Sequence, residues 1–337
     1  MKAGQWDHTT NKVVVNEVPI PEPGPGQVLI KVSSASLCHS DLMHHMRRDR
    51  RPITIGHEGV GIITKVHSTA EGHGFQVGDH VGCGYVIGCC FECEGCLTHN
   101  LLCSSGKQKL QGFTADGFFA EYAVEDWQNL AKLPESMDLT RAAPIFCAGI
   151  AAFHAIDSCE LKPGQWLAVV GCGGLGQLAT HYAKKMGLNV IGIDINDAKL
   201  DVVKKQGADA VFNSRSNTGY VEELKRLTNG GTHAVAVFSD ADAAYAAAPD
   251  VLRVNGVLMV IGIPKSNLSV NPMDLVSGKY RIKAECTSIP QRMMKAVDFI
   301  CKHNILPGIE FHKLEELPEM LDALQAGTAT KRMAVIF

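Results

Sequence analysis

The feature that most constrains this chain is a glycine-rich segment placed directly after an apolar run and directly before a helical pattern. It reads Val169-Val170-Gly171-Cys172-Gly173-Gly174-Leu175-Gly176. In that context Gly171 permits a tight turn, Gly173 lets the backbone approach a pyrophosphate, and Gly176 lets helix and strand pack closely. The amino end of the helix then faces the phosphate charge. The segment predicts a dinucleotide site that includes Gly174 and Leu175; the alternative is a glycine-rich turn without a ligand.

One acidic residue indicates which dinucleotide is bound. Asp194 ends the next apolar run, 23 positions after Gly171 (194 − 171). A carboxylate at that place can accept hydrogen bonds from the two ribose hydroxyls of NAD, and it repels the extra phosphate of NADP. NAD is therefore favoured over NADP.

The glycine segment belongs to a repeated alternation of apolar strands and helical patterns that begins after Pro163-Gly164. Such alternation predicts a parallel sheet covered by helices. The expected strands are 166–170, 190–194, 234–238 and 257–263, and the expected helices are 177–186 and 198–206.

The first 145 residues or so have a different texture. Short β-rich runs, such as 27–32 and 60–66, are separated by Gly and Pro punctuation at 21–26 and 71–78. This pattern predicts an irregular, mostly β domain. A length of 337 residues is enough for about two domains of ordinary size.

The composition limits the classes of binding partner and the cellular compartment that we expect. The 32 Lys and Arg against 35 Asp and Glu leave a formal charge of −3, which gives no reason to expect nucleic acid or an anionic membrane as partner. The N-terminus lacks a signal-peptide pattern, and no apolar run reaches the roughly 20 residues of a membrane helix. We expect a cytoplasmic protein, in which the 12 cysteines are metal ligands or core residues before they are disulfides.

Four closely spaced cysteines predict a closed metal site. Cys90, Cys93, Cys96 and Cys103 form a C-x2-C-x2-C-x6-C run, in which four thiolates can enclose one Zn2+. Four unrelated core cysteines are the alternative, but a loop rich in Gly and Glu offers them no core to fill. Because all four positions would be thiolates, such a zinc would stabilise the loop without doing chemistry. Cys89 adjoins the run and stays open as an alternative ligand.

Three further candidate ligands are dispersed. They are Cys38, His57 in Gly56-His57-Glu58-Gly59, and Cys147. Each is weak alone, because a histidine beside glycine is usually structural and an isolated buried cysteine is usually a small hydrophobic residue.

Several motifs follow one another along nearly the whole chain. In order, they are Cys38-His39-Ser40-Asp41, Gly56-His57-Glu58-Gly59-Val60-Gly61, Val77-Gly78-Asp79-His80-Val81, the four-cysteine loop, Gly117-Phe118-Phe119-Ala120-Glu121-Tyr122, Cys147-Ala148-Gly149, the glycine segment and Lys331-Arg332. Together they resemble the zinc-containing medium-chain alcohol dehydrogenase family. The resemblance implies an α/β protein: a GroES-like, mostly β catalytic domain over 1–146 and 286–337, with an inserted doubly wound Rossmann domain over 147–285.

The resemblance also implies roles around a second, catalytic zinc. Cys38, His57 and Cys147 would hold the metal and leave one position for water or a substrate oxygen, as Lewis-acid catalysis requires. Glu58 would lie beside the metal and could ligate it transiently, and Asp41 would orient the histidine. The alcohol proton would pass to Ser40.

Other matched positions imply contacts with cofactor and substrate. His39 and Arg332 would face the cofactor pyrophosphate, and Lys199 would contact the ribose, although a lysine on a helix is commonly just solvated. Ile263, at the end of the last apolar run, is a further candidate cofactor contact. Tyr85 would line the substrate pocket.

Two departures from the family pattern affect these expectations. Met43 stands where many members carry a histidine that passes the proton to solvent, so His44, His45 or bulk water would take over that step. The last gap of the four-cysteine loop, 97–102, is one residue shorter than is usual in the family, which affects the geometry expected for the fourth ligand, Cys103.

The expected function is a zinc-dependent oxidoreductase that moves a hydride between an alcohol or aldehyde and NAD(H), including the case of an aldehyde reductase in a biosynthetic pathway. Its partners would be a small alcohol or aldehyde and further copies of itself, as a homodimer or homotetramer. The alternatives are a catalytically inactive cofactor-binding zinc protein, or a polyol or NADP-linked dehydrogenase. Metal content separates the first alternative: two zincs per chain for the enzyme, one for the inactive protein.

Overall fold

The computed structural model describes residues 1–47, 51–287, 289–329 and 331–337, with the side chain of His44 outside that description. These residues form two compact units, Met1–Cys147 with Ser288–Phe337, and Ala148–Thr287. The domain limits expected from the sequence stay a prediction beside this division. Among the described helices, none combines the length and apolar character needed to cross a bilayer.

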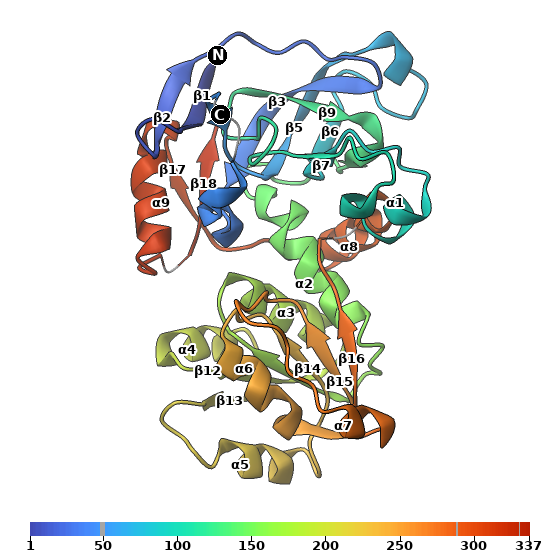
Figure 1. Cartoon of the computed structure of the whole chain (residues 1–337), viewed down its shortest axis with the longest axis vertical. Helices are drawn as coiled ribbons and strands as arrows, with labels where there is room; N and C mark the ends of the chain where they lie inside the picture. Colours follow the sequence, from blue (N-terminus) through green and yellow to red (C-terminus); the bar gives the residue numbers. More distant parts are fainter. Residues whose placement is uncertain (48–50, 288, 330) are drawn as a thin grey trace. The chain divides into compact units, whose positions relative to one another are not determined.

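The first unit is built on a mostly antiparallel sheet in the order β10-β6-β5-β3-β18-β17, with β9 also paired to β3. Strands from the two ends of the sequence, blue and red in Figure 1, share this sheet because β18 pairs with β3. Only β17 and β18 run parallel within the described sheet. Its strands are β3 (Gln27–Ser36), β5 (Glu58–Val66), β6 (His80–Cys83), β9 (Tyr122–Asp126), β10 (Leu130–Lys132), β17 (Ile309–His312) and β18 (Arg332–Ile336).

Strand β3 is central, which explains its composition. It pairs with β5, β9 and β18 and exposes only Lys31, so the run Gln27-Val28-Leu29-Ile30 reads as nearly continuous apolar sequence. The predicted β-rich runs 27–32 and 60–66 are confirmed as parts of β3 and β5. Opposite each other in the β3–β5 pair lie Ser36 and Glu58, at the end of the sheet where the site is built.

Smaller elements complete the first unit. A three-stranded sheet has the order β2-β1-β4, and β7 pairs with β8. These elements are β1 (Lys2–Asp7), β2 (Lys12–Glu17), β4 (Ile53–Thr54), β7 (Val86–Ile87), β8 (Lys109–Leu110), α1 (Glu94–Thr98), α8 (Pro290–His303) and α9 (Leu317–Gln325). Short 3-10 turns include η1 (His39–Leu42), η2 (His44–Met46), η3 (Ser68–Ala70), η4 (Asn100–Leu102), η5 (Trp127–Asn129), η6 (Ala143–Phe146) and η8 (Leu314–Glu316).

The second unit contains a parallel sheet in the order β13-β12-β11-β14-β15-β16. Renumbered within the sheet this is 3-2-1-4-5-6, the order typical of dinucleotide-binding doubly wound folds. The predicted parallel sheet covered by helices is thus confirmed (Figure 1). Its elements are α2 (Ala148–Asp157), β11 (Trp166–Val170), α3 (Gly174–Lys185), β12 (Asn189–Asp194), α4 (Asp197–Lys205), β13 (Ala210–Asn213), α5 (Tyr220–Leu227), β14 (Thr232–Val237), α6 (Asp242–Ala247), η7 (Ala248–Val251), β15 (Leu252–Val260), α7 (Pro272–Val276) and β16 (Tyr280–Ala284).

The prediction of a strand over 257–263 was wrong at the carboxyl end of the strand. Strand β15 stops at Val260, and Ile263 lies in the following loop with 79% of its surface exposed. The chain turns away because Ile261 and Gly262 both donate backbone hydrogen bonds to the carbonyl of Val237, and Pro264 follows. Apolar composition alone could not reveal this turn.

Candidate metal centres and cofactor site

The dispersed ligand candidates come together in the first unit. The ligand atoms of Cys38, His57, Glu58 and Cys147 all lie within 4.8 Å of one another. They come from three segments far apart in the sequence: the residue before η1, the start of β5, and the residue after η6. Two thiols, an imidazole and a carboxylate are donor groups that Zn2+ accepts. The donor set therefore fits a zinc ion.

Asp41 fixes the orientation of His57. The Nδ1 of His57 and Oδ1 of Asp41 are 3.1 Å apart, and Oδ2 of Asp41 accepts a hydrogen bond from the backbone N–H of Cys38 at 2.9 Å. Asp41 is fully buried. With Nδ1 engaged, the other ring nitrogen of His57 is left for a metal, as is usual for histidine ligands.

The two thiols of this group titrate together. A hydrogen bond from Cys147 is the largest cause that lowers the pKa of Cys38 well below its usual value, and contact with His57 adds to it. The same hydrogen bond, followed by burial, raises the pKa of Cys147. Burial lowers the pKa of His57, but Asp41 and Cys38 together raise it well above its usual value. The pocket thus favours one thiolate, the ligand form of cysteine, before a metal contributes its own charge.

Glu58 is held in place from two sides. Its Oε2 accepts a hydrogen bond from Ser36, and both carboxylate oxygens lie 2.5 Å from Nη2 of Arg332. Burial and the nearby Cys38 raise the pKa of Glu58 to about 7, against the lowering effect of Arg332. Arg332, expected from the resemblance to face the cofactor pyrophosphate, is placed by the structure against Glu58; its cofactor contact stays a prediction.

Glycines next to these ligands are required by close packing. Gly56, which precedes His57, has φ +93°, a conformation that favours glycine, and a side chain there would meet the ring of Phe119 at 2.5 Å. A Cβ on Gly82 would lie 1.8 Å from the ring of Phe146, the residue before Cys147. Glycine at 82 therefore lets the Phe146 ring pack against the sheet and so places Cys147.

The four-cysteine loop also closes on itself. The ligand atoms of Cys90, Cys93, Cys96 and Cys103 lie within 4.8 Å of one another. The sulfur of Cys90 is 3.9 Å from that of Cys96 and 3.6 Å from that of Cys103. A zinc tetrahedron with Zn–S bonds of about 2.3 Å has edges of about 3.8 Å, so the sulfurs are already spaced for the ion. The shortened gap 97–102 is spanned by α1 and η4, and Cys103 still reaches the group.

Backbone N–H groups favour thiolates in this loop. Cys93 accepts hydrogen bonds from the N–H groups of Ser104 and Cys96, and the Ser104 contact is the main cause that lowers its pKa to about 5. A hydrogen bond with Ser105 lowers the pKa of Cys103 to about 7. Cys89 lies outside the group of four, with its thiol directed to the carbonyls of Val86 and Asn100, and burial raises its pKa to about 12.

In the second unit the glycine segment links β11 to α3. Gly171 has φ +89°, and a Cβ on Gly176 would lie 2.0 Å from the carbonyl oxygen of Gly171, so helix and strand meet closely there. A Cβ on Gly173 would meet no atom within 4 Å. The backbone at Gly173 therefore borders open space at the amino end of α3, where Gly174 and Leu175 begin the helix.

Asp194 ties this segment to the end of β12. Its Oδ2 accepts a hydrogen bond from the N–H of Cys172 at 2.7 Å, and its Oδ1 accepts from Ile195 and Asn196. An ionised carboxylate has about four acceptor positions, so one remains for a further donor. Lys199 and Ile263 are exposed, and Lys199 uses its backbone N–H to bond Asn196.

The proton-relay candidates lie on η1 and η2. Ser40 is half-buried, two residues after Cys38, whereas His39 and His45 are exposed. Met43 keeps 36% of its surface exposed. The His44 side chain lies outside the described residues. The role of His44 in proton relay therefore stays a prediction.

Three contacts at the group of Cys38, His57, Glu58 and Cys147 were not found by sequence reasoning. Ser36 bonds Glu58, Phe113 places its ring 5.3 Å from that of His57, and Arg47 contacts Asp41. None belongs to the quoted motifs, and only the fold brings them to the site. Tyr85, which was expected to line the pocket, does lie beside His57, with the ring centres 5.4 Å apart and edge to face.

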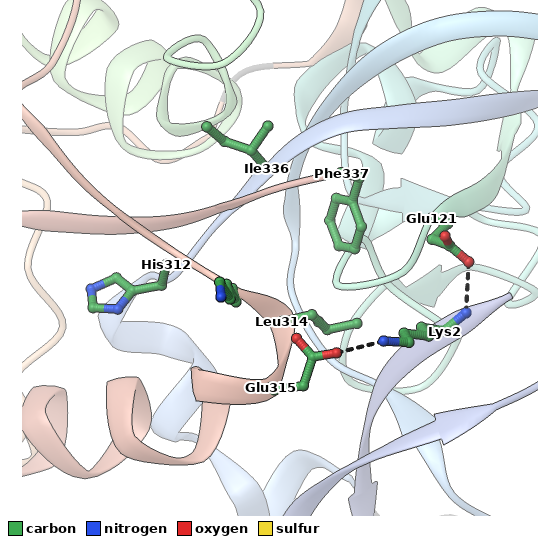
Figure 2. A pocket seen from close by; sticks show the side chains of 8 residues that line it. Lys2, Glu121, His312, Leu314, Glu315, Ile336 and Phe337 are labelled. Carbon is green, nitrogen blue, oxygen red and sulfur yellow. Dashed lines mark hydrogen bonds and ion pairs between the residues drawn. The ribbon is translucent and has the colours of Figure 1, made fainter.

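A separate pocket of the first unit, of about 380 Å3, shares no residue with either ligand group (Figure 2). Two acids on its wall are engaged by Lys2, whose Nζ contacts Glu315 at 2.7 Å and whose backbone N–H donates to Glu121 at 2.7 Å. These contacts attach the first strand to the rest of the unit. We assign this pocket no part in the chemistry.

Two family models match the chain. The alcohol dehydrogenase GroES-like domain matches residues 24–135, and the zinc-binding dehydrogenase domain matches residues 174–302. The first covers the part that contains Cys38, His57, Glu58 and the four-cysteine loop. The second covers most of the parallel sheet with Asp194.

Similar proteins agree over the full length. An alcohol dehydrogenase of Geobacillus stearothermophilus is 33% identical over 343 residues, which covers 99% of this chain and 98% of the relative. The solved alcohol dehydrogenase of Aeropyrum pernix is 26% identical with a TM-score of 0.87, covering 100% of both chains. A zinc-binding dehydrogenase of Sinorhizobium meliloti 1021, solved with NADP, is 23% identical with a TM-score of 0.86, covering 100% of this chain and 99% of the other; it supports the fold alone.

Proposed function

This chain belongs to the zinc-containing medium-chain alcohol dehydrogenase family, and on that premise we propose that its first unit holds two zinc ions and its second unit binds NAD. The protein is a zinc-type alcohol dehydrogenase, an enzyme that interconverts alcohols and aldehydes with a nicotinamide cofactor. The catalytically inactive alternative is not favoured.

The observation that carries the proposal is the convergence of Cys38, His57 and Cys147, with Glu58 beside them, in one buried group. Three firm ligands leave an open coordination position, as in other catalytic zinc sites. When bound, the zinc would polarise the substrate oxygen, and the nicotinamide would accept or supply the hydride. Simple alcohols and aldehydes are favoured over polyols because the third ligand is Cys147.

The protein side chains divide the remaining work. Asp41 holds the proton on Nδ1 of His57, and the hydroxyl oxygen of Ser40 accepts the proton that leaves the alcohol. Beyond Ser40, where the chain has Met43, the proton passes to His44, His45 or bulk water. If turnover of a His44→Ala, His45→Ala double variant keeps the parent pH dependence, both histidines are removed from the relay.

The four-cysteine group is assigned a structural zinc. Its sulfur spacing matches a tetrahedron, and four protein ligands leave no open position for substrate. On the cofactor side, the carboxylate of Asp194 retains an acceptor position for the ribose of NAD, and its charge disfavours the phosphate of NADP. His39, Lys199, Ile263 and Arg332 are further proposed cofactor contacts, and Tyr85 a proposed wall of the substrate pocket.

The chain is also proposed to form homodimers, with a tetramer as the larger alternative. Helix α7 buries none of its five residues, and three of them are apolar. Met273, Leu275 and Val276 expose 68, 41 and 84% of their surfaces. Val254, at the start of β15, exposes 80%, and β16 is an edge strand of the described sheet. Exposed apolar side chains beside the edge of a sheet are typical of a surface covered by a partner.

Metal analysis combined with activity tests the assignment. Wild-type protein should contain two zincs per chain and turn over some member of a panel of alcohols and aldehydes with NAD(H). Cys38→Ser should keep one zinc, the fold and NAD binding while losing activity; Cys93→Ser should lose the other zinc. Cys301→Ser, outside both groups, is the control. Full activity in zinc-replete Cys38→Ser protein contradicts the proposal.

A further inference from the structure

A buried arginine lies behind the proposed catalytic zinc site. Arg47 follows η2 and is only 3% exposed. Its Nη1 donates a hydrogen bond to the backbone carbonyl of Asp41 at 2.9 Å, and its Nη2 lies 3.8 Å from the Asp41 carboxylate. Arginine is not a residue that proteins bury without compensation, because removing a cation from water is energetically costly. A buried guanidinium at this place therefore calls for a role.

The guanidinium also holds a second segment against the site. Its Nε donates to the carbonyl of Gly112 at 2.8 Å. Its carbon lies 5.2 Å from the ring centre of Phe113, and the same ring lies 5.3 Å from that of His57. Trp6 is a further ring neighbour, at 5.8 Å. Arg47 thus contacts Asp41 on one side and, through Phe113, reaches His57 on the other.

The surroundings of Asp41 explain why this contact matters for a metal ligand. Asp41 is fully buried and accepts from both His57 and the backbone of Cys38. The Arg47 guanidinium faces this side chain from the protein interior, with Nη2 3.8 Å from Oδ1 of Asp41 and both side chains fully buried. Arg47 therefore restrains the residue that orients His57.

We propose that Arg47 is a positioning residue, which holds Asp41 in place and thereby fixes His57 as a zinc ligand. The proposal rests on the proposed function, since it takes His57 as a ligand. In this role Arg47 acts on the proposed zinc ligands through another residue. Its effect is transmitted through Asp41.

Zinc affinity of the catalytic site measures this role without relying on turnover. In Arg47→Met protein, where the long apolar side chain can still pack on Phe113 and Trp6, we expect catalytic-site zinc affinity to fall by about 10- to 100-fold, as for other residues that orient a metal ligand. The structural zinc should stay bound. The spectrum of protein with Co2+ in the catalytic site should change as well, because it reports ligand geometry. Arg141→Met, which removes a guanidinium bonded to the carbonyl of Pro307, is the matched control and should change neither readout.

Two further variants separate positioning from simple loss of packing. Arg47→Lys restores the charge but not the planar fork, so it should recover part of the lost affinity. In an Asp41→Asn background, Arg47→Met should lower zinc affinity by less than about twofold, because the coupled partner is already neutral. An undiminished effect in that background overturns transmission through Asp41.

Wild-type zinc affinity and an unchanged Co2+ spectrum in Arg47→Met protein overturn the proposal. If the Arg47→Met variant does not fold, the test uses Arg47→Lys. Wild-type zinc affinity of the catalytic site in Arg47→Lys protein then overturns the proposal. A failure of the proposed function would be seen in a different measurement. In that case wild-type protein would hold only one zinc, and Cys38→Ser would not change the zinc content.

Discussion

Arg332 binds both carboxylate oxygens of Glu58 through one guanidinium nitrogen, at 2.5 Å to each, in a pair whose side chains are 10 and 0% exposed. Removing one member of a buried pair leaves an uncompensated charge, which typically costs about 3 to 5 kcal/mol. Arg332→Leu should therefore lower the free energy of unfolding by about that amount in urea titrations. The double variant Arg332→Leu, Glu58→Gln should recover part of the loss; equal stability of single and double variants would contradict the pairing.

Two glycines of the loop between β11 and α3 should respond differently to substitution by alanine. Gly173 has φ −72°, and a methyl group added there would meet no atom within 4 Å. Gly173→Ala should therefore leave the unfolding midpoint unchanged while weakening NAD binding at least about tenfold, because the methyl occupies space for the pyrophosphate. Gly176→Ala should instead destabilise the fold by about 1 to 3 kcal/mol, since its Cβ would overlap the Gly171 carbonyl. Calorimetric titration with NAD and thermal unfolding measure both. Undiminished NAD binding by Gly173→Ala would argue against the cofactor placement.

Cofactor preference should depend on the charge of Asp194. Asp194→Asn keeps an acceptor for the N–H of Cys172 but loses the negative charge. Because a hydrogen bond to a charged group contributes about 1.5 to 3 kcal/mol, the ratio of NADP to NAD dissociation constants should fall by about tenfold or more. Asp197→Asn, an exposed acid at the start of α4, is the control. The same ratio in both variants and the parent would remove Asp194 as the determinant.

Stability should depend on pH through Glu125, away from both metal groups. Burial, reinforced by Asp126, raises its pKa well above the usual 4.5. The folded state therefore holds a proton that the unfolded state releases above pH 4.5, so this contribution is complete below that pH and is lost as the pH rises toward the folded pKa. Glu125→Gln, which keeps an acceptor for Asn129, should gain stability over the parent as pH rises, by at most about 1.4 kcal/mol per pH unit. Urea unfolding at several pH values measures the difference, and a constant difference from about pH 5 to 8 would contradict the buried neutral carboxyl.

The assembly proposal can be tested with one charge. Val276→Glu places a carboxylate on the exposed face of α7 and should shift the particle mass measured by light scattering toward that of a smaller assembly. Val77→Glu, at a valine of the first unit that is 61% exposed, should leave the mass unchanged. A parent protein that is already monomeric, or a Val276→Glu protein with the parent mass, contradicts an interface at α7.

Local sequence determined the elements of the second unit. The glycine segment, the acid at Asp194 and the strand–helix alternation each state a backbone requirement within a few residues, and β11, α3 and β12 follow it closely. The four-cysteine group is equally local, because all of its ligands fall within 14 positions (103 − 90 + 1). Where the pattern was purely apolar, as in 257–263, it could not say where the strand ends.

The proposed catalytic zinc site depends on the tertiary structure. Nothing in the sequence by itself joins Cys38, His57 and Cys147, and only the family resemblance suggested the set. They meet because β3 pairs with β5 and because Gly82 leaves room for the ring of Phe146. The pairing of β18 with β3 then brings Arg332 to Glu58, 274 positions away in the sequence. Arg47 and Phe113 belong to no motif, and their contacts arise from long-range packing. Backbone requirements that involve only neighbouring residues can be predicted from the sequence. A buried network of charged side chains forms only after the sheet has brought residues from distant segments together.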